Sequence, residues 1–416
     1  MSEVAHIPQL RFPEFEGSWS SVSILGTTNP ELKYGIVDGP FGSNLKTIHY
    51  KKSGIPIITS GYVTDGFFNA DSYLYVTEEK FNKEKRSAVN GGDIVMAKIG
   101  ARCGSSAILP KNHPTGILSG NALKITVDNN SHSTNFIWQI LWSLYQGHKL
   151  DLLRTVGAQP AISIANLKKY KLSLPTKPEQ QKIAAFLTEV DTKIEQLSKK
   201  QELLGEYKKG LTQQIFSQAI RFKAGDGSDF PDWEEKKLGD VFEIKAGQSK
   251  SKHIKKDGKN IIVDMGGISS EPKLVAKKLT DYDDDFLTTN DLVMPKDDIG
   301  GGLIIGKVAE IPENNKYICG DHIYKLTVVN GNITFLKYAI NSYQVNKSFR
   351  QKANGTAQIG LSRKEVENQL LSFPSLKEQT KIANFLSSID SKIEQVGKQL
   401  NESKQFKKAL LQQMFV

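Results

Sequence analysis

Two stretches of the sequence carry apolar residues at alternating intervals of three and four positions, the spacing that places them along one side of an α-helix. In residues 175–216 these positions are Leu187, Val190, Ile194, Leu197, Leu204, Leu211 and Ile215. In residues 374–416 they are Leu386, Ile389, Ile393, Val396, Leu400, Leu410 and Met414. The pattern predicts two long helices, each with a coiled-coil seam, that pair with each other.

Polar residues refine this prediction at the helix starts and within the seams. Thr176 and Ser375 precede Glu179 and Glu378 by three positions, which is the spacing of a capping box, so we expect each carboxylate to reach back to the helix cap. The seams also contain polar residues, which weaken packing but favour one register over the alternatives. These residues are Gln201, Lys208, Ser403 and Lys407.

The two helical stretches are copies of one sequence. Residues 175–216 align without a gap to the residues 199 positions later, and about half of the aligned positions are identical. Two unrelated amphipathic helices would share the periodicity but not the polar identities, so the match indicates a duplication. The identical pairs include Glu179/Glu378, Gln180/Gln379, Phe186/Phe385, Asp191/Asp390 and Lys193/Lys392.

The segments before the helices, residues 1–174 and 217–373, have similar lengths and read as β-rich, with turns at Gly, Asn and Asp. Faint parallels connect them: Phe12-Pro13 with Trp19 matches Phe230-Pro231 with Trp233, residues 92–96 match 290–294, and GAQPAIS at 157–163 matches GTAQIGLS at 355–362. The chain is therefore predicted to be α+β: a first β-rich domain at 1–174, a first spacer helix at 175–216, a second β-rich domain at 217–373 and a second spacer helix at 374–416, arranged as a pseudo-twofold repeat with antiparallel helices.

Charge narrows the class of partner. The formal net charge is +10, which favours either nucleic acid or an anionic membrane surface. No apolar run approaches the ~20 residues needed to span a bilayer, and the first residues lack the apolar core of a signal peptide. We therefore expect a cytoplasmic protein.

Basic residues gather in the stretches where the two domains differ most. A charge run is usually a solvated face, but together with the net charge these residues favour contact with phosphates. The candidates for phosphate contact are Lys46, Lys51, Lys52, Lys98, Arg102, Lys250, Lys252, Lys255 and Lys256. The candidates for reading base edges, where paired donors and acceptors are needed, are Asn44, Arg102, Gln159, Gln358 and Arg363.

The repeated pattern resembles the specificity subunits of type I restriction–modification systems over nearly the whole chain. It runs from Leu174-Pro175 through Glu179-Gln180, Ile183-Ala184, Phe186-Leu187, Asp191 and Ile194, and returns from Phe373-Pro374 to Ile393. The stretch from Asp38 to Lys46 also looks like the motif that opens many recognition domains of this family, whereas the second domain departs from it at residues 243–249.

The resemblance implies that each domain reads one half of a bipartite double-stranded DNA target and that the chain is not itself an enzyme. It implies that the helices dock two methyltransferase subunits, which bind S-adenosylmethionine and methylate adenine, and that ATP-dependent motor–nuclease subunits join the assembled complex. Identical partners need similar surfaces, so the outward residues shared by both helices are the candidate docking positions. They are Glu179, Gln180, Asp191, Lys193, Glu378, Gln379, Asp390 and Lys392.

The sequence lacks the motifs that would let the chain do this chemistry alone. No Asn/Asp-Pro-Pro-aromatic tetrapeptide occurs, which argues against methyl transfer. The glycines from Gly301 to Gly306 with Lys307 have the spacing of a phosphate loop, but Val308 stands where Ser or Thr would hold magnesium. Cys103 and Cys319 form no CxxC pair and are expected to be ordinary buried thiols. Neither a metal nor a cofactor is predicted for this chain.

Two other classes of function stay open at this level: a stand-alone DNA-modifying enzyme with an unfamiliar active site, and a coiled-coil assembly scaffold with no DNA role. The purified chain would methylate or cut DNA without added subunits in the first case. In the second case it would bind DNA without sequence preference and without loss on addition of salt.

Overall fold

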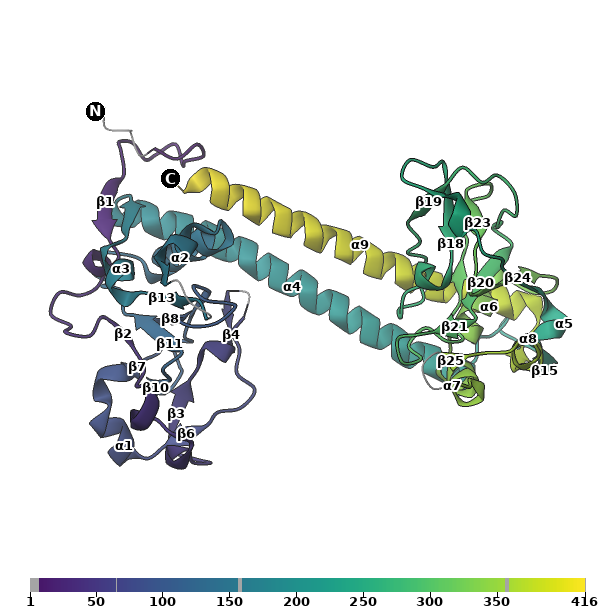
Figure 1. The fold of residues 1–416 in the computed structure, drawn as a ribbon, viewed down its shortest axis with the longest axis horizontal. Helices are drawn as coiled ribbons and strands as arrows, with labels where there is room; N and C mark the ends of the chain where they lie inside the picture. Colours follow the sequence, from purple (N-terminus) through teal and green to yellow (C-terminus); the bar gives the residue numbers. More distant parts are fainter. Residues whose placement is uncertain (1–6, 65, 156–158, 356–358, 416) are drawn as a thin grey trace. The chain divides into compact units, whose positions relative to one another are not determined.

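The computed structural model describes residues 7–64, 66–155, 159–355 and 359–415, and the chain divides into two compact units. Unit 1 contains residues 1–198 together with 399–416, and unit 2 contains residues 199–398. Each unit therefore holds one β-rich segment, half of the first long helix and half of the second. The long helices are α4 (Lys177–Phe216) and α9 (Leu376–Met414), labelled in Figure 1.

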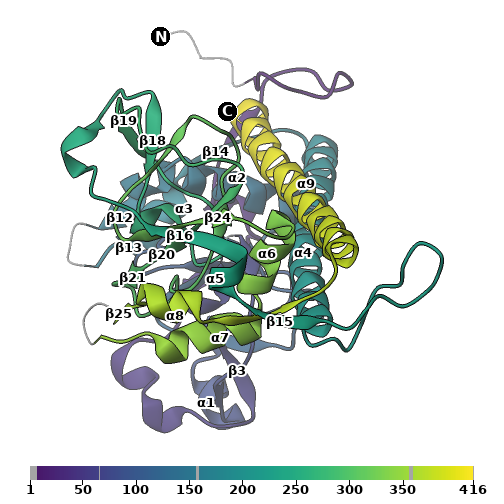
Figure 2. The same cartoon turned by 90° about the vertical axis from the view of Figure 1, so that its right-hand side faces the viewer.

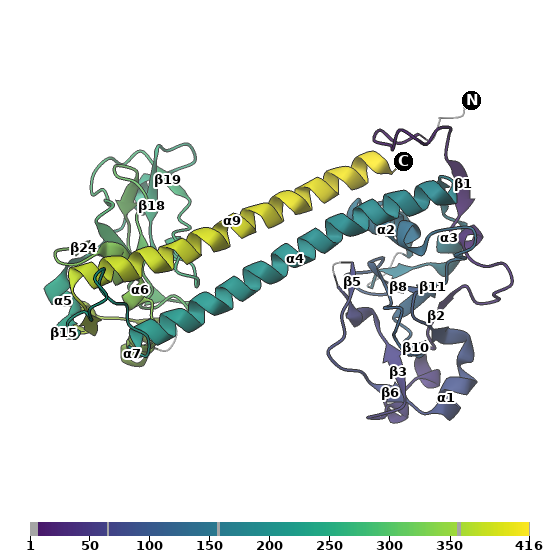
Figure 3. The ribbon, with the colours of Figure 1, turned by 180° about the vertical axis from the view of Figure 1, so that it is seen from behind.

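Unit 1 is built on two four-stranded sheets. The first is antiparallel throughout and has the order β2 (Ile36–Asp38), β11 (Ala122–Ile125), β8 (Ile94–Ala97) and β9 (Ser106–Ile108). The second has the order β6 (Tyr75–Val76), β3 (Ile55–Ile58), β10 (Gly116–Leu118) and β7 (Ala88–Val89), with β3 parallel to β10. Three strand pairs complete the unit: β1 (Ser20–Ser23) with β14 (Lys171–Leu174), β4 (Val63–Thr64) with β5 (Phe67–Phe68), and β12 (Arg154–Thr155) with β13 (Ala161–Ile162). Its shorter helices are α1 (Glu78–Lys83), α2 (Thr134–Gln146) and α3 (Ile164–Lys169), which are labelled in Figure 3. Helix α2 packs against β9 of the first sheet.

Unit 2 has the same plan. Its first sheet is antiparallel, in the order β16 (Phe242–Ala246), β24 (Ile323–Val328), β20 (Asp291–Pro295) and β22 (Ala309–Glu310). Its second sheet has the order β17 (Ile254–Lys255), β19 (Lys278–Thr280), β18 (Asn260–Val263) and β23 (Tyr317–Cys319), with β18 parallel to β23. The strand pairs are β15 (Glu234–Lys237) with β26 (Leu370–Phe373) and β21 (Asp297–Asp298) with β25 (Ile359–Gly360). Its shorter helices are α5 (Leu238–Val241), α6 (Ile333–Ile340), α7 (Tyr343–Lys352) and α8 (Arg363–Glu367), with α6 to α8 visible in Figure 2. The predicted α+β fold with two β-rich domains is confirmed.

The two long helices pack antiparallel in each unit. In unit 1, Leu187 near the start of α4 shares a core with Leu410 and Met414 at the end of α9. In unit 2, Ile215 at the end of α4 shares a core with Ile382 near the start of α9. The seam prediction therefore holds at both ends.

Two ion pairs in the seam are related by the repeat. Asp191 pairs with Lys407 at 2.5 Å in unit 1, and Asp390 pairs with Lys208 at 2.5 Å in unit 2. Asp390 is the copy of Asp191 and Lys407 is the copy of Lys208, each 199 positions later in the chain. The two ion pairs are therefore equivalent under the repeat. These bonds favour the antiparallel register, which is the role predicted for the seam lysines.

A buried aspartate lies at the start of a central strand in the first sheet of each unit, Asp93 at β8 and Asp291 at β20. Asp93 accepts hydrogen bonds from the Thr126 hydroxyl (2.6 Å) and the Lys124 ammonium (3.4 Å). In unit 2, Asp291 accepts a hydrogen bond from the Thr327 hydroxyl (2.5 Å) and pairs with the Lys325 ammonium (3.5 Å). A buried carboxylate needs such partners, so the match between residues 92–96 and 290–294 reflects one structural device used twice.

The capping boxes at the helix starts form only in part: the Ser375 hydroxyl accepts from the Glu378 amide at 3.5 Å, but the glutamate side chains have other partners. Glu179 is 1% exposed and accepts two hydrogen bonds from the Arg11 guanidinium, at 2.7 and 2.8 Å. Glu378 is 0% exposed and accepts bonds from Arg221 (3.0 Å) and from the Trp233 indole (3.1 Å). Each glutamate therefore ties the segment that precedes a β-rich domain to the first turn of a long helix, instead of reaching back to the cap.

The neighbouring glutamines are also internal anchors. The Gln180 side chain donates to the Pro175 carbonyl (2.9 Å) and accepts from the Ser133 amide (3.0 Å) just before α2. Gln379 bonds in the same way to Pro374 (2.8 Å) and Asn332 (2.8 Å) just before α6. The prediction that the two glutamates and two glutamines face outward is wrong, because burial lets each of them satisfy polar groups of its own unit.

The structure also corrects one sequence parallel. Phe12 stacks edge-on against Phe186 with ring centroids 5.9 Å apart, and Phe222 does the same with Phe385 at 5.4 Å. The residue of the second domain that is equivalent to Phe12 is therefore Phe222, not Phe230. The tryptophans were matched correctly, since Trp19 packs on Phe136 and Trp233 packs on Phe335.

Candidate DNA-recognition surface

In each unit, one loop leaves the end of a central strand and is held by the segment that matched in sequence. In unit 1 the loop after β8 begins at Lys98, whose carbonyl accepts from the Ile162 amide (2.9 Å), and the Gly100 amide donates to the Pro160 carbonyl (3.0 Å). In unit 2 the loop after β20 begins at Lys296, whose carbonyl accepts from the Leu361 amide (2.9 Å). The described residues of the GAQPAIS and GTAQIGLS segments therefore lie beside equivalent loops.

A glycine with no room for a side chain marks another equivalent place. A Cβ atom on Gly39 would overlap the Ser119 carbonyl, and a Cβ atom on Gly247 would overlap the Gly320 carbonyl. Both glycine amides bond to the adjacent strand, at Ala122 (3.2 Å) and Ile323 (3.0 Å). The second domain therefore keeps the glycine that the close backbone approach requires, although the residues around it differ.

Most candidates of the first domain are exposed and lie in the loops between its strands. Asn44, Lys46, Lys51 and Lys52 are exposed, as are Arg102 and Gln159. Arg102 donates to the Thr64 hydroxyl at 3.2 Å, which leaves much of its guanidinium available to a ligand.

Lys98 lies in a different setting. Its side chain is 15% exposed, and its ammonium pairs with Asp38 at 2.5 Å and lies over the Phe41 ring. Asp38 and Phe41 belong to the sequence motif that resembles the opening of recognition domains, so this motif and Lys98 form one local cluster. We interpret Lys98 as a residue that holds the loop in place.

The basic run of the second domain is divided by the fold. Lys250 is 7% exposed, lies over the Tyr282 ring and pairs with Asp285 at 3.4 Å. Lys252 and Lys256 are exposed. Lys255 is exposed but pairs with Asp281 at 2.5 Å, and this hydrogen bond raises the pKa of Lys255. The prediction that Lys250 is a surface cation is wrong, because its side chain is buried and its ammonium group interacts with Tyr282 and Asp285 inside the domain.

The remaining two candidates of the second domain are Arg363 and Gln358. Arg363 is the first residue of α8 and pairs with Glu367 at 2.6 Å. Gln358 lies outside the described residues.

Neutralising the exposed lysines tests whether this loop contacts DNA. We expect the Lys252→Gln/Lys256→Gln variant to bind every duplex more weakly and to show a smaller dependence of affinity on salt, because each lost phosphate contact removes about 0.9 from the logarithmic slope. The measurement is fluorescence anisotropy on duplexes at several salt concentrations. Lys273→Gln, another exposed lysine of unit 2, is the control. A change in base preference would place the loop in a groove instead.

The candidate docking residues fall into two groups. Lys193 and Lys392 are exposed on equivalent turns of α4 and α9. Asp191 and Asp390 are occupied by the seam: besides the lysines, Asp191 accepts from Gln139 (3.0 Å) and Asp390 accepts from the Tyr338 hydroxyl (2.5 Å). Burial and the Asp390 bond raise the pKa of Tyr338. Lys193 and Lys392 are therefore exposed, Asp191 is largely covered, and Asp390 is paired although 40% of its side chain is exposed.

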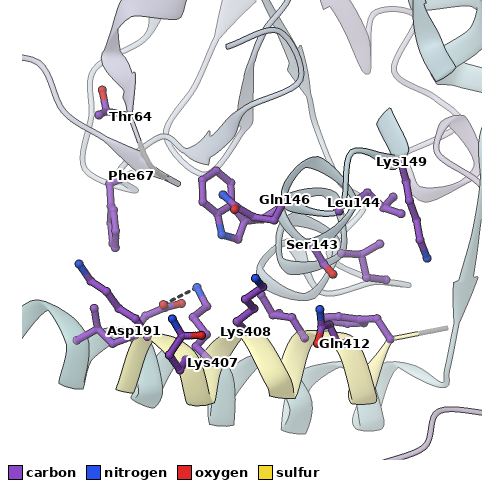
Figure 4. Close-up of a pocket in the computed structure, with 18 of the residues that line it drawn as sticks. Thr64, Phe67, Ser143, Leu144, Gln146, Lys149, Asp191, Lys407, Lys408 and Gln412 are labelled. Carbon is purple, nitrogen blue, oxygen red and sulfur yellow. Dashed lines mark ion pairs between the residues drawn. The ribbon is translucent and has the colours of Figure 1, made fainter. Parts of the chain in front are cut away.

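Unit 1 contains a crevice of about 1210 Å³ between the β4–β5 hairpin, α2 and the helix pair. Phe67, Lys149, Lys408 and Gln412 line it, together with the ion-paired side chains of Asp191 and Lys407 (Figure 4). The lining is repeated only in part: Ser143, Leu172 and Phe415 correspond to Ser342, Leu371 and Phe216, which line a smaller pocket of about 350 Å³ in unit 2, whereas Lys404 and Leu411 correspond to Gly205 and Thr212.

The described residues contain no group of three or more His, Cys, Asp or Glu side chains able to hold a metal ion. Cys103 and Cys319 are both buried and free, as predicted, and burial raises the pKa of Cys319 to about 12. Within the same part of the chain, no helix is both long and apolar enough to cross a membrane.

Comparison with known proteins decides the family. The model of the family described as type I restriction modification DNA specificity domain matches residues 42–204 and again residues 231–404, well over half of the chain. The chain belongs to this family. The two matches correspond to the two halves of the repeat, so the duplication inferred from the helices extends through both specificity domains.

Two curated relatives match over most of the chain. The type I restriction enzyme MjaVIII specificity subunit of Methanocaldococcus jannaschii is 26% identical over 372 residues, which cover 86% of this chain and 84% of the relative. The putative MjaX specificity subunit of the same organism is 26% identical over 383 residues, covering 86% of each chain. The chain is thus a specificity subunit, the recognition component and not an enzyme.

Solved structures show the same fold. The S subunit of the type I restriction–modification system from M. genitalium matches with a TM-score of 0.62 at 17% identity, over 98% of this chain and 99% of that one. A chain from the structural work on complex assembly and conformational transition of the type I R-M system matches with a TM-score of 0.53 at 14% identity, over 94% and 96% of the two chains.

Sequence reasoning missed the arginines that organise each specificity domain. Arg11 and Arg221 each precede a phenylalanine, and this Arg-Phe pair occurs before each β-rich segment. The repeated dipeptide was the available signal. It was hidden because the second copy is separated from Trp233 by a longer insertion than the first copy is from Trp19.

Proposed function

We propose that this specificity subunit reads a bipartite double-stranded DNA target, with one half-site bound by each unit. The observation that carries the proposal is the repeat of the whole domain: two units with the same sheet order, equivalent loops after β8 and β20, and equivalent anchors to the long helices. Similar scaffolds with dissimilar exposed loops suit the same task performed on different sequences. Because the target is DNA, we place its action in the cytoplasm.

The direct test is binding by the chain assembled with its methyltransferase partner. We expect tight binding to one class of duplex that has two short specified blocks separated by a gap of fixed length, and weak, salt-sensitive binding to all others. The chain alone is expected to neither methylate nor cut DNA. Sequence-independent binding, or modification of DNA by the chain alone, would contradict the proposal.

We further propose that two copies of a methyltransferase subunit dock through equivalent positions of α4 and α9, and that motor–nuclease subunits join through the assembled complex. S-adenosylmethionine would be bound by the methyltransferase and ATP by the motor subunit, with no cofactor on this chain. Lys193 and Lys392 support this proposal, since both are exposed and occupy equivalent positions. The pseudo-twofold repeat would give each partner the same surface.

Charge reversal tests the docking positions. We expect Lys193→Glu and Lys392→Glu each to weaken binding of one methyltransferase subunit and the double variant to weaken both, because a surface charge that faces a partner of opposite sign becomes repulsive. Light scattering of titrated mixtures gives the stoichiometry and affinity. The control is Lys200→Glu, since Lys200 is exposed but its counterpart is Gln399. Unchanged assembly of the double variant would remove these lysines from the interface.

A further inference from the structure

A glycine-rich loop of unit 2, residues 298–304, is held in one conformation by a buried carboxylate. Asp298 is 4% exposed, and its two oxygens accept from the Gly300 amide (2.6 Å) and the Ile304 amide (2.8 Å). A single charged group bonded to amides at both ends of the loop restricts its motion. In sequence this loop has the spacing of a phosphate loop without its magnesium ligand, so the motif alone gives it no function.

Further contacts fix the same loop to the core of unit 2. The Arg350 Nε donates to the Gly302 carbonyl (3.1 Å), and the Asn346 side chain donates to the Ile305 carbonyl (3.0 Å). Gly306, with a φ of +69°, packs against Phe349 so closely that a Cβ atom would collide with its ring. The loop therefore has a rigid base formed by residues of α7.

Two large aliphatic side chains protrude from this braced loop. Ile299 is 66% exposed and Leu303 is 57% exposed. One exposed aliphatic residue is ordinary on any protein surface. Two of them on a single restrained loop give two apolar contacts at defined positions. The conformational entropy lost on binding is small, because the loop is already fixed in the free protein.

The base of the loop is positively charged. Lys307 is partly buried, and both its burial and the charge of Arg350 lower the pKa of its ammonium group. Arg350 is exposed and its Nε bonds to the Gly302 carbonyl, so a guanidinium lies at the base of the loop near the Lys307 ammonium, and an anion beside both groups would be stabilised. Duplex DNA presents negatively charged phosphates along the rims of its grooves, and among the base edges in the major groove only thymine carries an apolar methyl group.

We propose that the 298–304 loop is a base-reading element of the second domain, in which Ile299 and Leu303 contact thymine methyl groups in the major groove while Lys307 and Arg350 bind the adjacent phosphates. This inference rests on the proposed function and names the chemistry of one half-site. The equivalent loop of unit 1 carries the exposed Arg102 and Ala101 and no such aliphatic pair among its described residues. The two units thus read their half-sites by different chemistry.

Uracil substitution tests the methyl contact directly, because uracil differs from thymine only in lacking the methyl group. The target sequence of the assembled complex is first identified by mapping the sites that it methylates. The probe is a duplex of this sequence in which every thymine of the second half-site is replaced by uracil. We expect the wild-type complex to bind the uracil duplex roughly 10-fold more weakly. The Ile299→Ser/Leu303→Ser complex is expected to bind the thymine and uracil duplexes with equal affinity.

Val329→Ser is the matched control, because Val329 is an aliphatic residue of unit 2 that is 70% exposed outside the loop. It should retain the full loss on uracil substitution. An equal loss in the wild type and the Ile299→Ser/Leu303→Ser variant, or a second half-site without an A·T pair, would overturn the inference. A complex with no sequence preference at all would instead contradict the proposed function, so the two failures are distinguishable.

The phosphate contact has its own readout. Lys307→Gln is expected to weaken binding to the thymine and uracil duplexes alike and to reduce the salt slope by about 1. Lys347→Gln, on the same helix as Arg350, is the control and should leave the slope unchanged. An unaltered slope in Lys307→Gln, with thermal unfolding as in the wild type, would exclude Lys307 from the phosphate site.

Discussion

Exchanging unit 1 for that of a related specificity subunit is expected to change one half of the methylated sequence completely and to leave the other half intact. The reason is that each unit has its own hydrophobic core, and independent cores can be exchanged without disturbing each other. The half-site contributed by unit 2 serves as the internal control in the same molecule. Methylation mapping in a host that carries the hybrid system gives the result.

The structure defines where the exchange should be made. The end of α9 belongs to unit 1, where Phe415 packs on Phe136 with ring centroids 5.5 Å apart and the Gln413 carbonyl accepts from the Leu10 amide (3.0 Å). Exchange of residues 1–198 together with 399–416 keeps these contacts within one parent. Exchange of residues 1–174 alone combines two parents in one core, so we expect that hybrid to unfold at lower temperature. A change in both half-sites with the larger exchange would refute the independence of the units.

The second large effect concerns stability. Arg221→Ala leaves Glu378 buried without its arginine, and an unpaired buried carboxylate costs about 3–5 kcal/mol. We expect unit 2 to lose that much of its free energy of unfolding, measured by urea denaturation. Arg11→Ala should have the same effect on unit 1, because Arg11 and Glu179 make the equivalent pair.

Two further variants separate this effect from general loss of charge. Arg221→Ala/Glu378→Gln removes the uncompensated charge and should recover part of the stability. Lys223→Ala removes an exposed ion pair with Asp229 and should cost no more than about 1 kcal/mol. Equal stability of Arg221→Ala and the wild type would show that the Glu378 carboxylate does not depend on the arginine.

The parts of the fold that depend on periodicity could be predicted from the sequence. The seams of α4 and α9 follow from residues such as Leu187 and Leu386, whose spacing is set by the geometry of the helix. The spacing alone does not give the antiparallel orientation of the two helices. The β-rich character of both domains follows from turn residues and short apolar runs. The duplication made each of these predictions twice, which strengthened both.

The contacts of single polar residues could not be predicted in the same way. Glu179 and Glu378 have the spacing of a capping box, but tertiary structure brings an arginine from a distant segment, and a guanidinium satisfies a buried carboxylate better than one amide does. Lys250 looked like the other lysines of its run until the fold placed Tyr282 and Asp285 beside it. Local pattern does not contain the partners that long-range folding supplies.

Base-reading residues are the hardest to predict, since they depend on which loop tips are exposed and rigid. Arg102 and Gln159 could be named as candidates because their residue types suit base edges. Ile299 and Leu303 were not, because apolar residues in a sequence are assigned to the core by default. Their exposure is visible only once Asp298 and α7 have fixed the loop.

The central claim, that one chain specifies a two-part DNA target, is tested most directly by mapping methylated adenines across the genome of a host with the intact system and of the same host without this gene. We predict a single motif made of two short specified blocks separated by a gap of fixed length, present in the first host and absent from the second. A continuous motif without a gap, or methylation that persists without the gene, would contradict the account.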